Sequence, residues 1–224
     1  MNTHPFRVPR AVLFANGDLP RPDIARALLR PTDLIVAANG GSRHCHRFGV
    51  VPTLLVGDAD SLPRDVKAWL VANEVPQRRF DADKEATDLE LAVDAAQEMG
   101  VGELLLLGLA GGRVDHMLAN FALLAQAPQR NLAMTAVVGR QRIIPIWTSQ
   151  RVVGRVGDTL SLIPWGSDIQ GVHTKGLRWN LRGESLFFAG SRGVSNRLTE
   201  ESAEISLKSG LLLVIHEFTA PVLE

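Results

Sequence analysis

A chain of 224 residues with 46% hydrophobic and 21% charged residues can bury a substantial core, which excludes a disordered protein. Its 24 basic and 24 acidic residues give a formal net charge of zero. This balance argues against a general nucleic-acid or membrane-surface binder, which would carry a basic excess. The single cysteine cannot form an internal disulfide, and the chain has neither an apolar run of the ~18 residues that span a membrane nor a signal-peptide h-region. We therefore expect a cytoplasmic protein that binds no nucleic acid and no membrane.

Short apolar runs in the first part of the chain predict the strands of a parallel sheet. They are continuous rather than alternating, as expected for strands that are covered on both faces. Amphipathic stretches between them predict helices, and this order favours a doubly wound α/β domain. The predicted strands are VLFA (12–15), LIVAA (34–38), TLLV (53–56) and ELLLL (103–107).

Glycine and aspartate gather directly after these predicted strands. The segments are NGD (16–18), NGG (39–41), GDAD (57–60) and GLAGGRVD (108–115). In open α/β sheets, ligands bind beyond the carboxyl ends of the strands. Glycine permits close approach of phosphate, and aspartate can bind a metal, so we expect the site at this edge of the sheet.

The pattern changes from about residue 145, where short, turn-bounded segments rich in β-branched residues begin. They predict a small antiparallel β domain. The alternation in AEISLKSGLLLVIHEF predicts a hairpin around Ser209-Gly210. We place the domain boundary after residue 143, which gives one domain over residues 1–143 and a second over 144–224.

The pair Asp58 and Asp60 in GDADS allows two readings. In extended backbone, carboxylates at i and i+2 point the same way and would suit Mg²⁺. The plainer reading is a helix start with Ser61 as N-cap. The two readings are compatible.

The segment DKEATD (83–88) lies at a predicted helix start. Thr87 is the expected N-cap, with Glu90 as its capping-box partner. Asp88 and a bound anion would both be stabilised by the positive end of the helix dipole. Lys84 would add a positive charge there, although an ordinary solvated helix start has the same composition.

The segment GGRVDH (111–116) favours function over a plain turn. Gly111 and Gly112 let backbone N–H groups approach phosphate oxygens. Arg113 can bind phosphate through two hydrogen bonds, and Asp115 begins a helix. A glycine turn alone would need neither charged residue.

Other candidates lie outside these motifs. Residues 44–46 (HCH) resemble a metal cluster, but adjacent helical residues point apart by ~100°, so a structural role is expected. Trp179 could stack on a flat heterocycle while Ser195 and Asn196 form hydrogen bonds to it. The alternative is a core tryptophan and a turn. The common P-loop, dinucleotide and serine-hydrolase motifs are missing from the sequence.

In this order, the motifs resemble those of the thiamine pyrophosphokinase family, whose members transfer a diphosphate from ATP to thiamine. The resemblance implies a homodimer with a doubly wound, mostly parallel α/β nucleotide domain, a small antiparallel β-sandwich domain, and thiamine at the subunit interface. The motifs that carry the resemblance are GDADS (57–61), DKEATD (83–88), GGRVDH (111–116), GLRWNL (176–181) and the pair Ser195-Asn196.

The resemblance also implies roles for individual residues. Asp58, Asp60 and Asp88 match the residues that bind Mg²⁺ and the nucleotide phosphates, and Asp115 lies near the reacting hydroxyl. These four form the expected catalytic set. The residues expected to bind ATP are Gly40, Gly41, Lys84, Thr87, Gly111, Gly112 and Arg113. The residues expected to bind thiamine are Trp179, Ser195 and Asn196.

The chain departs from the family pattern at three positions. The family usually has Asp where this chain has Asn39, Phe where it has Ala59, and Asp where it has Glu85. The alternatives are a pyrophosphokinase for another heterocyclic alcohol, such as a hydroxymethylpterin, and a non-catalytic nucleotide sensor. All four expected catalytic acids are present, which disfavours the sensor.

Overall fold

The computed structural model of the protein describes residues 9–80 and 86–219, which form two compact units. Unit 1 consists mainly of residues 29–123, and unit 2 mainly of the chain from Thr135 onward. Within the described ranges, no helix combines the length and the apolar character needed to cross a membrane.

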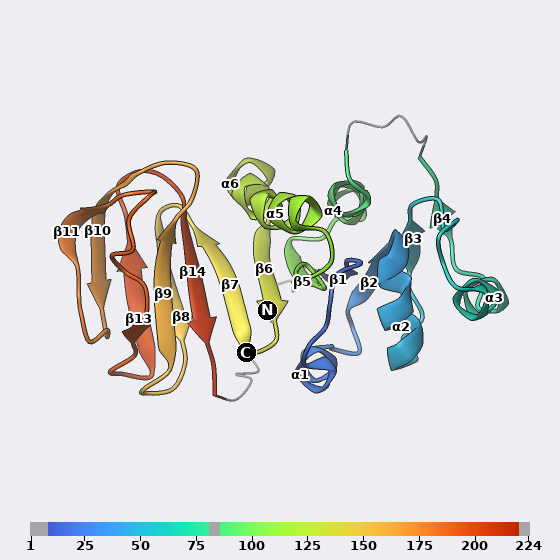
Figure 1. The fold of residues 1–224 in the computed structure, drawn as a ribbon, viewed down its shortest axis with the longest axis horizontal. Helices are drawn as coiled ribbons and strands as arrows, with labels where there is room; N and C mark the ends of the chain where they lie inside the picture. The colour runs from blue at the N-terminus through green and yellow to red at the C-terminus, as the bar shows by residue number, and fades with distance from the viewer. Residues whose placement is uncertain (1–8, 81–85, 220–224) are drawn as a thin grey trace, which may run out of the picture. The chain divides into compact units, whose positions relative to one another are not determined.

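Unit 1 is built on parallel strands in the order β5-β1-β2-β3-β4, and the arrows of neighbouring β2 and β3 point the same way in Figure 1. The predicted strands are confirmed. The two-residue β4 was not predicted, because it is too short to contain an apolar run. The strands are β1 (Arg10–Phe14), β2 (Leu34–Ala38), β3 (Leu54–Val56), β4 (Gln77–Arg78) and β5 (Glu103–Leu107).

The strand order reverses beside β1. The chain steps from β1 to β4 in one direction and then returns through α4 to β5, on the other side of β1. Because such crossovers are right-handed, α2 and α3 cover one face of the sheet, and α4 covers the other, where it contacts β1, β2 and β3. The helices are α1 (Pro22–Ala27), α2 (Ser42–Phe48), α3 (Arg64–Ala72), α4 (Asp88–Glu98), α5 (Val114–Ala122) and α6 (Ala127–Arg130), with the 3₁₀ turns η1 (Asn39–Gly41) and η2 (Leu123–Gln126).

Two predicted helix caps have different outcomes. The hydroxyl of Thr87 accepts a hydrogen bond from Glu90 N (3.2 Å), which confirms Thr87 as the N-cap of α4. The prediction for Ser61 was wrong, because α3 begins at Arg64 after an N-cap at Pro63. Before the helix, the chain makes a turn that buries Leu62. A hydrogen bond from Leu62 N to Ala59 O (3.2 Å) closes this turn, so the helix starts later.

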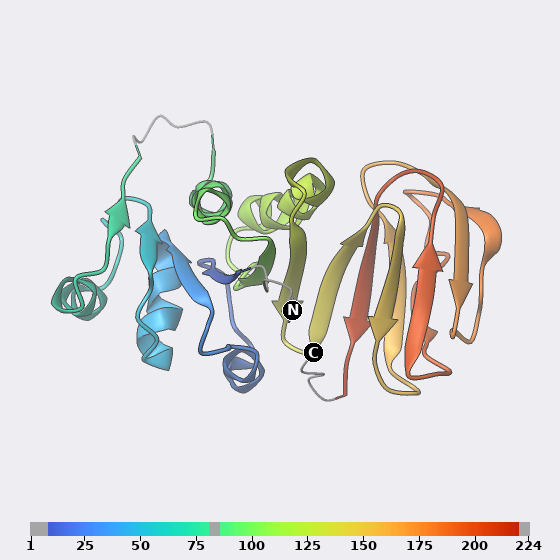
Figure 2. The same cartoon turned by 180° about the vertical axis from the view of Figure 1, so that it is seen from behind.

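Unit 2 is a sandwich of two antiparallel sheets, in the orders β12-β9-β14-β7-β6 and β11-β10-β13-β8. Figure 2 shows β7 and its neighbour β14 running in opposite directions. The strands are β6 (Ala133–Val138), β7 (Gln141–Ile146), β8 (Ser149–Val153), β9 (Thr159–Pro164), β10 (Ile169–Lys175), β11 (Arg182–Leu186), β12 (Asn196–Arg197), β13 (Ser202–Ser206) and β14 (Leu212–Glu217).

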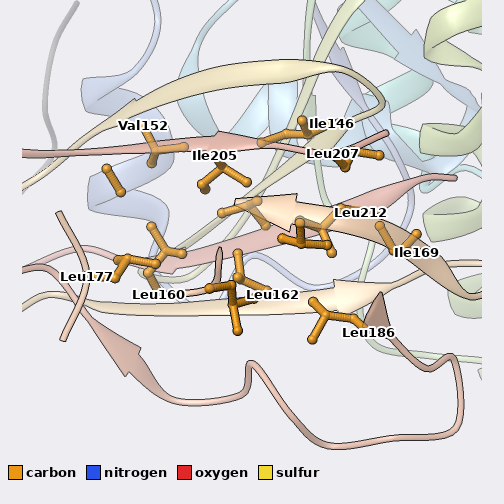
Figure 3. Close-up of a cluster of buried hydrophobic side chains, with 14 of the residues drawn as sticks. Ile146, Val152, Leu160, Leu162, Ile169, Leu177, Leu186, Ile205, Leu207 and Leu212 are labelled. Atoms are coloured by element: carbon orange, nitrogen blue, oxygen red, sulfur yellow. The ribbon is translucent and has the colours of Figure 1, made fainter. Parts of the chain in front are cut away.

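Buried side chains from both sheets form the core of the sandwich, and Figure 3 shows them gathered between the strands. Leu160 and Leu162 of β9 contribute from one sheet, and Val152 and Ile205 contribute from the other. The alternating burial of β9 follows its alternating sequence, because successive strand residues face opposite sides.

The hairpin predicted at Ser209-Gly210 was wrong. The two flanking strands lie in different sheets, since β13 pairs with β8 and β10, whereas β14 pairs with β7 and β9. Gly210, at φ 99°, packs against Ile169 where the chain crosses between the sheets. The predicted boundary after residue 143 lies within β7 and stays a prediction of where two folding domains would divide.

A buried polar network lies inside unit 2. The carboxylate of Asp158 accepts hydrogen bonds from His216 Nε2 (2.9 Å), Arg155 N (2.9 Å) and both N (3.2 Å) and Oγ1 (3.1 Å) of Thr219. Nη2 of Arg142 lies 3.3 Å from His216 Nδ1. Because a guanidinium only donates, Nδ1 accepts and Nε2–H donates, so His216 is the neutral tautomer.

Burial lowers the pKa of His216, and the hydrogen bond to Asp158 only partly opposes this effect. Burial alone would raise the pKa of Asp158, but the bonds from Arg155, His216 and Thr219 outweigh it and hold the pKa below its usual value. The folded state therefore disfavours protonation of both groups.

Acidification should destabilise the protein through this network. The unfolded chain takes up a proton at His216 below pH ~6.5, whereas the folded chain resists it, so the free energy of unfolding should fall by about 1 kcal/mol between pH 8 and pH 5.5. Stability that depends on Asp158 is lost at lower pH still. Urea unfolding of His216→Gln should show a smaller fall over this range, and His173→Gln, at an exposed position, should match the wild type. Equal falls in all three proteins would contradict the prediction.

Candidate active site

A cavity of about 830 Å³ lies beyond the carboxyl ends of β1, β2 and β5 in unit 1. Its position is the point at which the strand order reverses, which is where open α/β sheets bind their ligands. The lining residues are Ala15, Asn16, Gly17, Asp18, Ala38, Asn39, Arg43, Ala86, Thr87, Asp88, Leu89, Gly111, Gly112, Arg113, His116 and Asn120.

The loops after β1 and β5 run side by side at the cavity. Gly17 N donates to Gly108 O (2.8 Å), and Asp18 N donates to Ala110 O (2.6 Å). Gly111 adopts φ 89°, and a Cβ atom there would lie 2.1 Å from Oδ2 of Asp18. Glycine at position 111 is therefore required both by the backbone conformation and by the close approach of the neighbouring loop.

An amide nitrogen joins two of the predicted acidic residues. Nδ2 of Asn39 donates to Asp58 Oδ1 (3.0 Å) and to Asp88 Oδ2 (3.1 Å). The three residues follow β2, follow β3 and begin α4, so separate elements bring them together. The two carboxylates offer the hard oxygen ligands that Mg²⁺ prefers, and the Asn39 N–H groups lie between them.

The geometry of GDAD differs from the one expected. Ala59 has φ 62°, so the backbone turns between the two aspartates instead of staying extended, and Asp60 N donates to Asp58 Oδ1 (3.1 Å). Among the residues that the structure describes, no three His, Cys, Asp or Glu side chains lie close enough to hold a metal. Mg²⁺ binding by Asp58, Asp60 and Asp88 stays a prediction.

Arg113 and Asp115 bind each other at the exit of the glycine turn. Nε of Arg113 donates to Asp115 Oδ1 (3.1 Å) and Nη2 donates to Oδ2 (2.6 Å), and both side chains are exposed. The Arg113 guanidinium holds the pKa of Asp115 below its usual value, and a hydrogen bond from His116 N adds to this effect. The carboxylate is therefore charged at neutral pH and is a weak proton acceptor.

The residues predicted to bind ATP divide into groups. Thr87, Gly111, Gly112 and Arg113 line the cavity. Gly40 and Gly41 are buried in η1 and are not among its lining residues. They serve close packing, since a Cβ atom at position 41 would lie 1.8 Å from Phe14 O. Lys84 and Glu85 lie outside the described residues.

The structure adds Arg43 to the candidate residues. Its Nε donates to Gly40 O (3.2 Å), and its Nη2 donates to Asn16 Oδ1, which aims the guanidinium at the cavity. Arg43 is the second residue after the NGG segment, and this closeness is the signal that could have identified it from the sequence. Asn16 and Asp18 belong to the NGD segment, which was expected at this edge of the sheet, whereas no role was predicted for His116 and Asn120 of α5.

The segment 44–46 has the structural role that was expected. Cys45 is fully buried, and burial raises the pKa of its thiol. A ring nitrogen of His44 lies 2.8 Å from Gly17 O, so this side chain supports the loop after β1.

A second cavity, of about 840 Å³, lies in unit 2 and contains the residues predicted to bind thiamine. Trp179 is 55% exposed, which excludes the alternative of a core tryptophan, and the Arg178 guanidinium lies 4.8 Å from its ring centroid. Ser195 is exposed at φ 61°. The lining residues are Arg178, Trp179, Asn180, Leu181, Arg182, Ser191, Arg192, Gly193, Val194, Ser195 and Asn196.

Asn196 is buried beneath Trp179 and holds its backbone. The Oδ1 atom accepts hydrogen bonds from Trp179 N (3.1 Å) and Arg197 N (2.9 Å), and Nδ2 donates to Trp179 O (2.8 Å). Asn196 is only 4% exposed. Its amide is therefore occupied in placing Trp179.

The unit 1 cavity is of the class that binds nucleotides and other phosphate-bearing ligands in α/β proteins. The family models support this class and specify it. The model described as thiamin pyrophosphokinase, catalytic domain, matches residues 25–136, and the one described as thiamin pyrophosphokinase, vitamin B1 binding domain, matches residues 147–212. The chain belongs to the thiamin pyrophosphokinase family, which confirms the resemblance found in the sequence.

Individual relatives agree with this assignment. The chain is 25% identical to the thiamine pyrophosphokinase of Bacillus subtilis over 169 residues, which cover 75% of this chain and 79% of the relative. It is 28% identical to thiamine pyrophosphokinase 1 of Oryza sativa, over 92% of this chain and 86% of the relative.

Solved structures share the fold. The crystal structure of thiamine pyrophosphokinase from Bacillus subtilis has a TM-score of 0.84 at 22% identity and covers 94% of this chain and 100% of its own. The crystal structure of the yeast enzyme has a TM-score of 0.77 at 19% identity, and the match covers 96% of this chain and 88% of the yeast chain. At these identities the likeness establishes the fold, and it confirms the predicted α/β unit followed by a β-sandwich.

Removing the Asn196 amide should destabilise unit 2. The variant Asn196→Ala leaves the N–H and C=O of Trp179 without their partners, so the free energy of unfolding should fall by about 2 kcal/mol. Gln150→Ala, which shortens an exposed amide side chain of the same unit, should change it by less than about 0.5 kcal/mol. Chemical unfolding of both variants measures the difference, and equal values would contradict the role of Asn196.

Proposed function

We propose that this protein transfers the diphosphate group of ATP to the primary hydroxyl of thiamine, giving thiamine diphosphate and AMP. The observation that carries the proposal is the unit 1 cavity, which gathers Asp88, Gly111-Gly112 and Arg113 from motifs that are separate in the sequence. Family membership over both units supplies the substrates. The comparisons give no support to a pterin substrate or to a nucleotide sensor.

The cavity offers several groups to the phosphates of ATP. Arg43 and Arg113 supply guanidinium groups, and each is at present bound to a protein acceptor that phosphate oxygens would replace. The N-terminus of α4 faces the cavity through Thr87 and Asp88, and its dipole favours a bound anion. Charge for an anionic substrate is thus supplied locally in a chain with no net charge.

A magnesium ion suits the carboxylates that meet at Asn39, of which Asp88 lines this cavity. Asp58 and Asp88 would hold it, together with the phosphates, and the amide oxygen of Asn39 is buried without a hydrogen-bond partner among the described residues. Bound there, the ion would neutralise phosphate charge. Asp60, whose backbone N–H donates to Asp58 Oδ1, would help to hold the ion from the same turn.

In the proposed reaction, the thiamine hydroxyl oxygen forms a bond to the β-phosphorus, and the bond from that phosphorus to the bridging oxygen of AMP breaks. The protein contributes alignment and charge more than covalent chemistry. Without the Arg113 hydrogen bonds that lower its pKa, the Asp115 carboxylate would accept the hydrogen bond of the hydroxyl, orient its oxygen and take up its proton as the bond to phosphorus forms. Arg113 would turn from Asp115 to phosphate as the substrate binds.

Thiamine would bind at the unit 2 cavity, where Trp179 offers an exposed ring and Ser195 a hydroxyl. We infer that a homodimer completes the site. Helix α5 supports an interface, because it has no buried residue although it carries Val114 (64% exposed) and Leu118 (54% exposed). Exposed apolar side chains on one element are typical of surfaces that bind a partner.

The reaction can be tested directly. With ATP, Mg²⁺ and thiamine, the purified protein should form equal amounts of AMP and thiamine diphosphate. Asp88→Asn should lower kcat by about 100-fold or more, because a charge that acts in the transition state is lost. Asp65→Asn removes an exposed carboxylate from α3 and should retain activity within about twofold. Turnover of a hydroxymethylpterin in place of thiamine would contradict the proposal.

A shared site can be tested by mixing two inactive chains. Asp88→Ala and Trp179→Ala damage different cavities, so random exchange of subunits should restore about a quarter of the sites if each site uses both chains. The mixture of Asp88→Ala with Asp58→Ala should stay inactive, since both changes remove carboxylates of the proposed Mg²⁺ site. Confirmed exchange without recovery in the first mixture would refute the shared site.

A further inference from the structure

One amide nitrogen in unit 1 bridges two carboxylates. Nδ2 of Asn39 lies 3.0 Å from Asp58 Oδ1 and 3.1 Å from Asp88 Oδ2, so each of its two hydrogens has an acceptor. Carboxylates brought together in a cleft repel each other unless a donor or a cation lies between them. The Asn39 amide supplies that donor.

The orientation of this amide leaves its other end unpartnered. An oxygen turned toward two carboxylates would meet only other acceptors, so the nitrogen must face them. Oδ1 is consequently buried, and within the described part of the chain it has no hydrogen-bond partner. A buried acceptor without a partner is unfavourable and rare in native proteins.

The backbone of Asn39 is also under constraint. The residue has φ 42°, in the left-handed region, and Asn is among the few residues other than Gly that adopt it readily. The neighbouring chain is close, since a Cβ atom on Gly57 would lie 2.9 Å from the Asn39 Cβ. The side chain is thus held in place between its two carboxylate acceptors.

We propose that Asn39 is a positioning residue that keeps Asp58 and Asp88 ready for a divalent cation and takes the place of that cation in the metal-free protein. The inference rests on the Mg²⁺ site of the proposed function, but not on which alcohol accepts the diphosphate. When the cation binds, the carboxylates no longer need the N–H donors. Half a turn of the amide then exchanges its two ends and presents the unpartnered oxygen as a neutral ligand.

Asparagine suits both states better than its close relatives do. An aspartate at position 39 would add a third negative charge and remove the donors, so the metal-free site would be destabilised and would bind the cation more tightly. A glycine would accept the backbone conformation without strain but leave the two carboxylates unbridged. These differences predict distinct metal dependences for the two variants.

The experiment compares melting temperatures without nucleotide, in EDTA and in excess Mg²⁺. In EDTA, Asn39→Asp should melt lower than the wild type by on the order of 3 °C or more, and Mg²⁺ should stabilise it more than it stabilises the wild type. Its dissociation constant for Mn²⁺, measured by electron paramagnetic resonance, should be on the order of tenfold lower because the ligand charge is greater. Asn131→Asp is the matched control, an exposed residue at φ 51° that gains the same charge, and it should show neither effect.

Equal shifts of the melting temperature in EDTA for Asn39→Asp and Asn131→Asp would overturn the proposal. Equal stabilisation of Asn39→Asp and the wild type by Mg²⁺ would also overturn it. Where Asn39→Asp does not fold in EDTA, Asn39→Gly decides. Asn39→Gly should have a lower melting temperature than the wild type in EDTA and should recover in Mg²⁺. A melting temperature of Asn39→Gly equal to that of the wild type in EDTA would refute the bridge. Turnover of thiamine is scored separately on the wild type, so a failed reaction with intact metal-dependent shifts would refute the substrate and leave the role of Asn39 standing.

Discussion

The reversal of strand order beside β1 is the constraint on which the candidate active site depends. Because β2 and β5 flank β1, the chain leaves β1 toward one side of the sheet and returns to β5 on the other side, and the loops after β1 and β5 line the cavity. The loops still touch at their bases through Gly17 N on Gly108 O. The position of the cavity is therefore set by the topology of the sheet.

Every cationic group named at this cavity is held by a polar or acidic partner in the ligand-free chain. Arg43 is bound to Asn16 and to Gly40 O, and Arg113 is bound to Asp115. The acidic groups are likewise held, by the Asn39 amide. A polyphosphate with its cation could replace both sets of contacts, because the anion suits the guanidinium groups and the cation suits the carboxylates. The arrangement favours a ligand that brings both an anion and a cation.

Local signals predicted the strands of unit 1 and one helix cap, although the cap predicted at Ser61 was wrong, and contacts between distant residues were not predicted. Continuous apolar runs identified β1, β2, β3 and β5, and Thr87 was recognised as a cap because its partner is three residues away. The hairpin at Ser209-Gly210 failed because strand pairing depends on the whole sandwich. The bridge from Asn39 to Asp58 and Asp88 spans 19 and 49 residues, and the clamp of Asn196 on Trp179 spans 17. No local pattern contains such contacts, so motif order alone indicated that these residues act together.

The exposed ring of Trp179 imposes a requirement on any ligand of unit 2. Trp179 is 55% exposed, and the buried Asn196 amide holds its backbone in place. One rigid face can stack a flat heterocycle on one side only, and the opposite face of that heterocycle would remain in water. Tight binding needs a second wall. Within one chain, unit 2 supplies the first wall, which is the Trp179 ring. The need for a second wall is the physical argument for a partner subunit at the proposed thiamine site.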